Sequence, residues 1–181
     1  MEVERQPHVG TGLTKTDLLD WGAESTKQVR ELHPEAVVVF IGANEGFPLP
    51  GPGGREIDCC GPDWAAVYAN RARRMMETYR QRGAARVYWL QLPLPRDSDL
   101  REVARTVNAG IEVAGEPFRA QVRVLDMAAL FTPGGAYRDS MTVDGRKQIV
   151  RENDGIHLNQ TGAEVAADPV LAAIRRDFGS P

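Results

Sequence analysis

The chain has 181 residues, of which 42% are hydrophobic and 26% are charged, and this predicts a single globular domain, residues 1–181, with its own core. Its net charge of -3 gives no general attraction to nucleic acid, and no basic run contradicts this. No apolar stretch is long enough for a membrane span, and the first residues are charged where a signal peptide would be apolar, so neither feature is expected.

The first part of the chain predicts a short strand, a helix and a buried strand. A charged, strand-like opening around Val3 leads into a glycine-rich turn at residues 10–12. Apolar residues at helical spacing predict a helix over residues 21–32, which ends before Pro34 because the residue preceding a proline avoids the helical region. The unbroken apolar run 36–41 predicts a strand that is buried on both faces, as is typical of a parallel sheet.

A long loop rich in proline and glycine follows, and then helices and strands alternate. Asp63 is expected to cap a helix over residues 64–82, and residues 87–92 predict the next strand. A helix at about residues 100–114 leads to a third strand at residues 122–126. This alternation predicts parallel pairing with right-handed crossovers, so the expected fold class is α/β, a three-layer doubly wound parallel sheet in which the three strands are neighbours.

The last part of the chain predicts a hairpin and a long helix. An Asp-Gly turn at residues 144–145 lies between short alternating runs, which indicates a β-hairpin. The final helix is expected to begin near Thr161 and to kink or restart at Pro169, because proline lacks the helical N–H donor.

Between the hairpin and the final helix, Asp154 lies three residues before His157 in a polar stretch. A carboxylate that accepts a hydrogen bond from one ring nitrogen fixes the imidazole tautomer, so the other nitrogen can take a proton from a nucleophile. The pair therefore predicts half of a hydrolytic site, and the other half must supply a nucleophile and donors to an oxyanion.

Two turns that contain glycine supply candidate oxyanion donors. Ligands of an open parallel sheet bind beyond the carboxyl ends of the strands, and residues 42–45 directly follow the strand at 36–41. The side-chain amide of Asn44 can donate to an anionic oxygen, and the backbone N–H of Gly12 can approach a ligand closely. An ordinary role in a tight turn is the alternative for both residues.

The order of these motifs resembles that of the SGNH (GDSL-type) hydrolase superfamily. V-G-T-G-L, then I-G-A-N-E after an apolar strand, then D-G-I-H-L before the last helix follow the family order, while L-L-D-W, D-W-A-A-V-Y-A-N-R-A and Y-W-L-Q-L-P are similar to a bacterial branch. The resemblance covers nearly the whole chain. It implies a flavodoxin-like hydrolase fold, acyl-ester substrates and an extracytoplasmic or cell-envelope location. It also implies that Gly12 and Asn44 are oxyanion donors, that His157 is the general base and that Asp154 orients it.

Two departures from the family pattern concern Glu45 and the nucleophile. The family's third block usually ends in Asp where this chain has Glu45. The family nucleophile is a serine in a G-D-S stretch after the first strand, and the residues before Gly10 contain neither serine nor that motif, so the first strand is expected to be missing. None of the serines in the chain follows a buried strand in a tight turn, and each is interpreted as a solvated polar residue: Ser25, Ser98, Ser140 and Ser180.

The two cysteines, Cys59 and Cys60, are adjacent in the long loop. Either could replace the serine as a nucleophilic thiolate, and a loop disulfide or two free thiols are the alternatives. No cofactor and no metal ion are implied, because the chain has neither a dinucleotide loop nor a P-loop and its cysteines and histidines are scattered. The three tryptophans are expected to pack in the core instead of stacking on a sugar.

Three hypotheses follow. In the first, the chain is most of a serine esterase or acyl hydrolase for acyl esters, among them carbohydrate O-acyl groups, and its first strand and nucleophile precede Met1. In the second, it is a noncatalytic binding or interaction module that retains the pocket. In the third, it is an O-acyltransferase domain of a cell-envelope protein. The chain without a nucleophile is expected to be inactive, and its unpaired sheet edge to cause self-association, rearrangement of the first ten residues, or aggregation.

Overall fold

Three parallel strands form the central sheet in the computed structural model, which describes residues 2–179. β1 (Ala36–Val39), β4 (Arg86–Leu90) and β5 (Val122–Leu125) lie in the order β1-β4-β5, and both neighbouring pairs are parallel. The prediction of three adjacent parallel strands is confirmed. Each strand ends one or two residues earlier than predicted, because the chain turns away from the sheet toward its loops.

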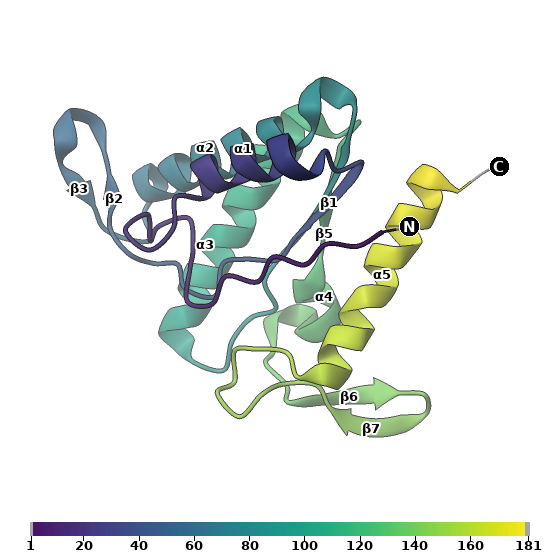
Figure 1. The fold of residues 1–181 in the computed structure, drawn as a ribbon. Coiled ribbons are helices and arrows are strands. Elements are labelled where there is room, and N and C mark those ends of the chain that lie inside the picture. The colour runs from purple at the N-terminus through teal and green to yellow at the C-terminus, as the bar shows by residue number, and fades with distance from the viewer. Residues whose placement is uncertain (1, 180–181) are drawn as a thin grey trace.

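Helices cover both faces of this sheet (Figure 1). α1 (Trp21–Leu32), α2 (Pro62–Tyr79) and α3 (Ser98–Gly115) share one core, which Val87 and Trp89 of β4 join from the sheet. α4 (Met127–Phe131) and α5 (Gln160–Phe178) share the other core, which the next residue of β4, Leu90, joins. Successive side chains of a strand point to opposite faces, so β4 contributes to both cores. The predicted three-layer α/β fold class is confirmed.

α1 has the predicted bounds, whereas α2 does not. α1 ends at His33, which adopts a left-handed φ of 46° directly before Pro34. α2 begins at Pro62, so Asp63 lies inside the first turn and is not the cap. Its end also comes earlier than predicted, because Gln81 and the residue after it adopt positive φ values that interrupt the helix.

Two predictions about the start of the chain are wrong. Residues 2–8 form no strand around Val3. The run 36–41 is not buried on both faces either, since the exposed fractions of Val38 and Phe40 are 48% and 42%. The second difference follows from the position of β1 at the edge of the sheet, because within residues 2–179 no strand pairs with its second side.

α5 continues through Pro169 as one helix, so the predicted restart is wrong. The helix begins after Asn159, whose side chain accepts a hydrogen bond from the N–H of Gly162. A proline inside a helix leaves one carbonyl without its donor. Here the helix continues past the proline because Val170 and Ala173 are buried against the rest of the domain.

Two hairpins extend from the domain. β6 (Ser140–Val143) and β7 (Arg146–Ile149) form the predicted one, and both residues of its Asp-Gly turn adopt the positive φ that a two-residue turn requires. β2 (Leu49–Pro50) and β3 (Glu56–Ile57) form a small hairpin within the long loop that was expected to be irregular. Short 3-10 turns lie at Pro52–Gly54, Gln81–Gly83, Glu116–Phe118 and Pro133–Gly135. Among the described residues, no helix combines the length and the apolar character needed to cross a membrane.

Candidate functional site

A cleft of about 440 Å³ lies beyond the carboxyl ends of β1 and β4, which is the usual place for a ligand in a parallel sheet. Asn44 and His157 both line it, as predicted, and the N-terminal turn contributes Gly10 and Thr11. Much of the remaining lining is apolar and comes from the segments after the two strands and from α3: Phe40, Ile41, Leu92, Pro93, Pro95, Leu100, Val103 and Ala104.

Asp154 and His157 make the predicted contact. His157 Nδ1 lies 2.6 Å from Asp154 Oδ2. The other oxygen, Asp154 Oδ1, accepts hydrogen bonds from the backbone N–H groups of Ile156 at 2.8 Å and His157 at 3.0 Å. Because an ionised carboxylate only accepts hydrogen bonds, Nδ1 carries the ring proton when the imidazole is neutral. Nε2 is then free to accept a proton, which is what a general base requires.

The Asp154 carboxylate should stay ionised well into acidic solution. The pKa of Asp154 is lowered to about 2, mainly by its hydrogen bond with His157. Burial of the carboxylate opposes this shift, and the two backbone N–H groups add to it. Because this pKa lies below that of a free Asp, about 3.9, the contact stabilises the loop fully above about pH 4 and is lost as the pH falls through about 2. A carbon-13 NMR titration measures this pKa, and His157→Ala should raise it. A wild-type midpoint near that of free Asp would contradict the contact.

Asn44 lies beside the peptide that joins Thr11 to Gly12. Asn44 Nδ2 donates to the C=O of Thr11 at 3.3 Å. A trans peptide directs its C=O and N–H to opposite sides, so the N–H of Gly12 points away from the Asn44 amide. Gly12 is buried and is not among the residues that line the cleft. The structure therefore brings Asn44 and the Asp154–His157 pair together, whereas Gly12 lies outside the lining of the cleft.

Glu45 holds this turn in place, a role that the sequence analysis did not assign. Its buried carboxylate accepts hydrogen bonds from the N–H groups of Leu13 at 2.6 Å and Thr14 at 2.9 Å. Burial raises the pKa of Glu45, and these hydrogen bonds and the charge of Arg71 oppose the rise. A Cβ on Gly12 would lie 3.0 Å from the Glu45 carboxyl group, so the close approach requires glycine. The feature of the sequence that could have indicated this role is the position of Glu45, directly after Asn44.

Replacing Glu45 with Ala should destabilise the domain strongly. The buried N–H groups of Leu13 and Thr14 would lose their acceptors, and two such losses cost about 2–6 kcal/mol in the free energy of unfolding. Denaturant unfolding measures this loss. Glu77→Ala is the matched control, because it breaks a surface ion pair with Arg80 and should cost less than about 1 kcal/mol. Equal losses in the two variants would contradict the role of Glu45.

None of the described residues that line the cleft is a serine or a cysteine. One lining residue has a hydroxyl group, Thr11, and its Oγ1 donates to the C=O of His8 at 2.8 Å. Ser25 was predicted to be solvated, but it is buried in α1 and donates to the C=O of Gly22 at 2.9 Å. Of the remaining serines, Ser98 is the first residue of α3 and Ser140 is the first residue of β6. Ser180 lies outside the described residues.

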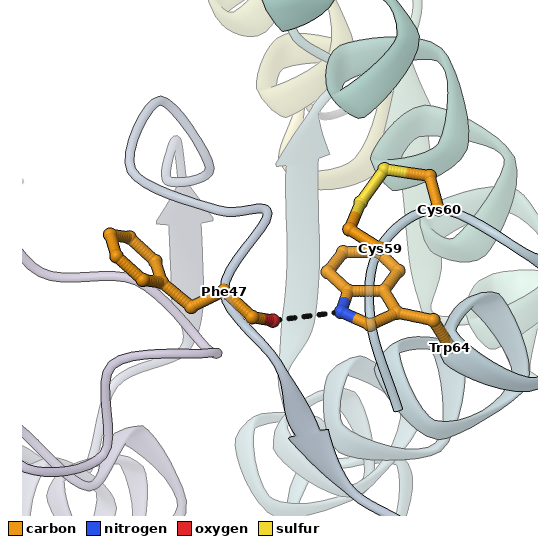
Figure 2. Close-up of a disulfide and its surroundings, with 4 residues drawn as sticks. All are labelled: Phe47, Cys59, Cys60 and Trp64. Atoms are coloured by element: carbon orange, nitrogen blue, oxygen red, sulfur yellow. Dashed lines mark hydrogen bonds between the residues drawn. A yellow bond between two sulfur atoms is a disulfide. The ribbon is translucent and has the colours of Figure 1, made fainter. Parts of the chain in front are cut away.

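Cys59 and Cys60 form a disulfide with each other in the loop before α2 (Figure 2). Beside it, the indole N–H of Trp64 donates to the C=O of Phe47 at 2.9 Å. The loop disulfide is therefore confirmed, and the alternatives of free thiols and of a thiolate nucleophile are wrong, since neither cysteine lines the cleft. All three tryptophans are buried, as expected for core residues.

Comparison with known proteins shows a shared fold and a family. Among solved structures, the fold is similar to a lipase/acylhydrolase from Enterococcus faecalis, with a TM-score of 0.53 and 20% sequence identity, over 86% of this chain and 71% of that chain. At this identity the likeness shows a shared fold. The family described as "Protein of unknown function (DUF459)" matches residues 1–173, and the chain belongs to this family. No curated protein sequence matches it.

Proposed function

We propose that this chain carries the general-base and oxyanion half of a serine acyl-ester hydrolase. The observation that supports this proposal is the position of the Asp154–His157 pair in the same cleft as Asn44. A serine hydroxyl attacks the ester carbonyl while His157 Nε2 takes its proton and Asp154 stabilises the imidazolium. Asn44 Nδ2 turns from the C=O of Thr11 to donate to the oxyanion. Gly12 is buried outside the cleft lining and adds no donor in this arrangement. His157 then protonates the leaving alcohol, and water releases the acyl group.

The nucleophile in this proposal comes from a strand that adds to the open edge of β1. A serine must lie within about 3 Å of His157 Nε2 to transfer its proton, and the described cleft lining offers none. Val38 and Phe40 point to the face that α5 covers over β4, and their exposure marks a place that a neighbouring element would cover. A parallel strand paired with β1 would end at the cleft, because the carboxyl ends of parallel strands share one edge of a sheet. A strand ending in G-D-S, encoded upstream of Met1, fits this place.

The substrate in this proposal is an acyl ester, and O-acyl groups of carbohydrates are included. Leu92, Leu100 and Val103 give the cleft an apolar wall on the side of α3, which suits the acyl group. The alcohol part of the substrate would lie toward the open side of the cleft, where His157 is exposed.

The test compares two proteins. One is the chain of 181 residues, and the other, the strand-completed protein, is the reading frame extended upstream of Met1. We expect the strand-completed protein to hydrolyse a short-chain aryl acetate, and the shorter chain not to exceed its own His157→Ala variant. Product analysis with an acceptor sugar separates hydrolysis from acyl transfer. Inactivity of the strand-completed protein, or His157-dependent activity of the shorter chain, would overturn the proposal.

A further inference from the structure

Arg151 is a buried cation beside the loop that carries Asp154 and His157. Only 2% of its surface is exposed. It stands where the chain enters the loop, and an isolated antiparallel bridge pairs it with Leu158, where the chain leaves the loop. Burying a guanidinium is costly unless its donors find acceptors, so the contacts of Arg151 show what the buried charge holds together.

The guanidinium of Arg151 connects two segments that reach the cleft from different parts of the fold. Nη1 donates to the C=O of Ile156 at 2.7 Å, inside the loop and next to His157. Nη2 donates to the C=O of Leu94 at 3.0 Å, in the segment that follows β4. The two nitrogens belong to one rigid plane, so they fix the loop relative to the central strand of the sheet.

Aromatic rings and acidic groups surround this guanidinium. Its carbon lies 5.9 Å from the ring centroid of Phe131 and 5.5 Å from that of Tyr137. Burial lowers the pKa of Arg151, while Tyr137 and the carboxylates of Asp139 and Asp154 act against this shift. Arginine stays charged in proteins, so both hydrogen bonds are charge-assisted and stronger than neutral ones.

We propose that Arg151 is a positioning residue, which holds the loop in the geometry in which Asp154 orients the His157 ring and His157 faces Asn44. This inference rests on the proposed function, because it concerns the same general base. Arg96 supports the loop from the other side, since its backbone N–H donates to the C=O of Gly155 at 2.9 Å. The exposed side chain of Arg96 adds a long contact, from Nη1 to the C=O of Asn153 at 3.4 Å. The two contacts of Arg151 are shorter and come from a buried side chain.

Arg151→Met tests the inference in the chain of 181 residues, without any nucleophile. Met fills much of the same volume and removes both donors. Nitrogen-15 shifts of the His157 ring report its tautomer, and we expect the Nδ1–H form to dominate in the wild type. In the variant, the Nε2–H form should increase several-fold. Amide exchange of Ile156 and His157 should accelerate by about tenfold or more, the factor for losing one charge-assisted hydrogen bond.

Arg123→Met is the matched control. Arg123 makes a bidentate ion pair with the nearly buried carboxylate of Asp177. This pair joins β5 to α5, and neither residue lines the cleft. This variant should lose stability and keep the wild-type tautomer of His157. A change of tautomer as large as that in Arg151→Met would show that loss of stability alone explains the effect, and would overturn the inference.

Arg151→Lys decides the question if the Met variant does not fold. Lysine keeps the charge but lacks the planar fork, so the tautomer shift should be present and smaller. A wild-type tautomer and wild-type amide exchange in a folded Met or Lys variant would overturn the inference. A shifted tautomer in these variants, combined with an inactive strand-completed protein, would support the positioning role and refute the proposed function.

Discussion

His157→Ala should lower kcat of the strand-completed protein by about 10⁴-fold or more, with little change in stability. The imidazole is the group that removes the proton of the nucleophile, and Asn44 can stabilise an oxyanion only after attack has begun. The side chain of His157 is 59% exposed, so its removal costs little packing. Steady-state kinetics with an aryl acetate and thermal unfolding measure the two effects separately.

Asp154→Ala should have a similar effect on turnover, because without its acceptor the His157 ring can turn and present the wrong tautomer. Asp168→Ala removes an exposed carboxylate from α5 and is the matched control, which should keep kcat within about twofold of wild type. Equal turnover in the Asp154 and Asp168 variants would show that the carboxylate does not orient the base.

The chain of 181 residues should self-associate through β1. Residues 2–8 form no strand that pairs with the open edge of β1, and Val38 and Phe40 add exposed apolar surface beside it. An unpaired, apolar edge strand is a template for pairing with a second copy. Sedimentation velocity should therefore show oligomers whose share increases with protein concentration.

Val38→Lys should shift this equilibrium to the monomer, because a lysine at an edge strand opposes the approach of a second sheet. Val113→Lys is the matched control, since Val113 is 55% exposed on α3 and lies away from the edge, and it should leave the association unchanged. A wild-type monomer at all concentrations, or equal effects of the two lysines, would contradict association through β1.

The central strands and the contact between Asp154 and His157 could be predicted from the sequence because their signals are local. The apolar run of β1 and the Asp-Gly turn of the β6–β7 hairpin determine their own backbone, and Asp154 reaches His157 within a single turn of the chain. The adjacent disulfide was one of three alternatives, because the spacing of Cys59 and Cys60 permits the bond without requiring it.

The remaining features depend on neighbours that are distant in the sequence. The exposure of Val38 depends on whether another element covers β1, which the residues of β1 do not reveal. The hydrogen bonds that Glu45 accepts join segments about thirty residues apart, and the side chain of Arg151 donates to the C=O of Leu94, 57 positions away in the sequence. α5 continues through Pro169 because residues distant in the sequence bury Val170 and Ala173, which follow the proline. Such contacts leave no periodic pattern in the sequence.

Fluorophosphonate labelling of the strand-completed protein, with mass spectrometry of the modified peptide, tests most directly whether the nucleophile comes from a strand beside β1. We expect one adduct, on a serine upstream of Met1, which is absent from the His157→Ala variant. The chain of 181 residues should not be labelled. An adduct on Thr11, Ser25, Ser98 or Ser140, formed by the shorter chain and dependent on His157, would contradict this origin of the nucleophile.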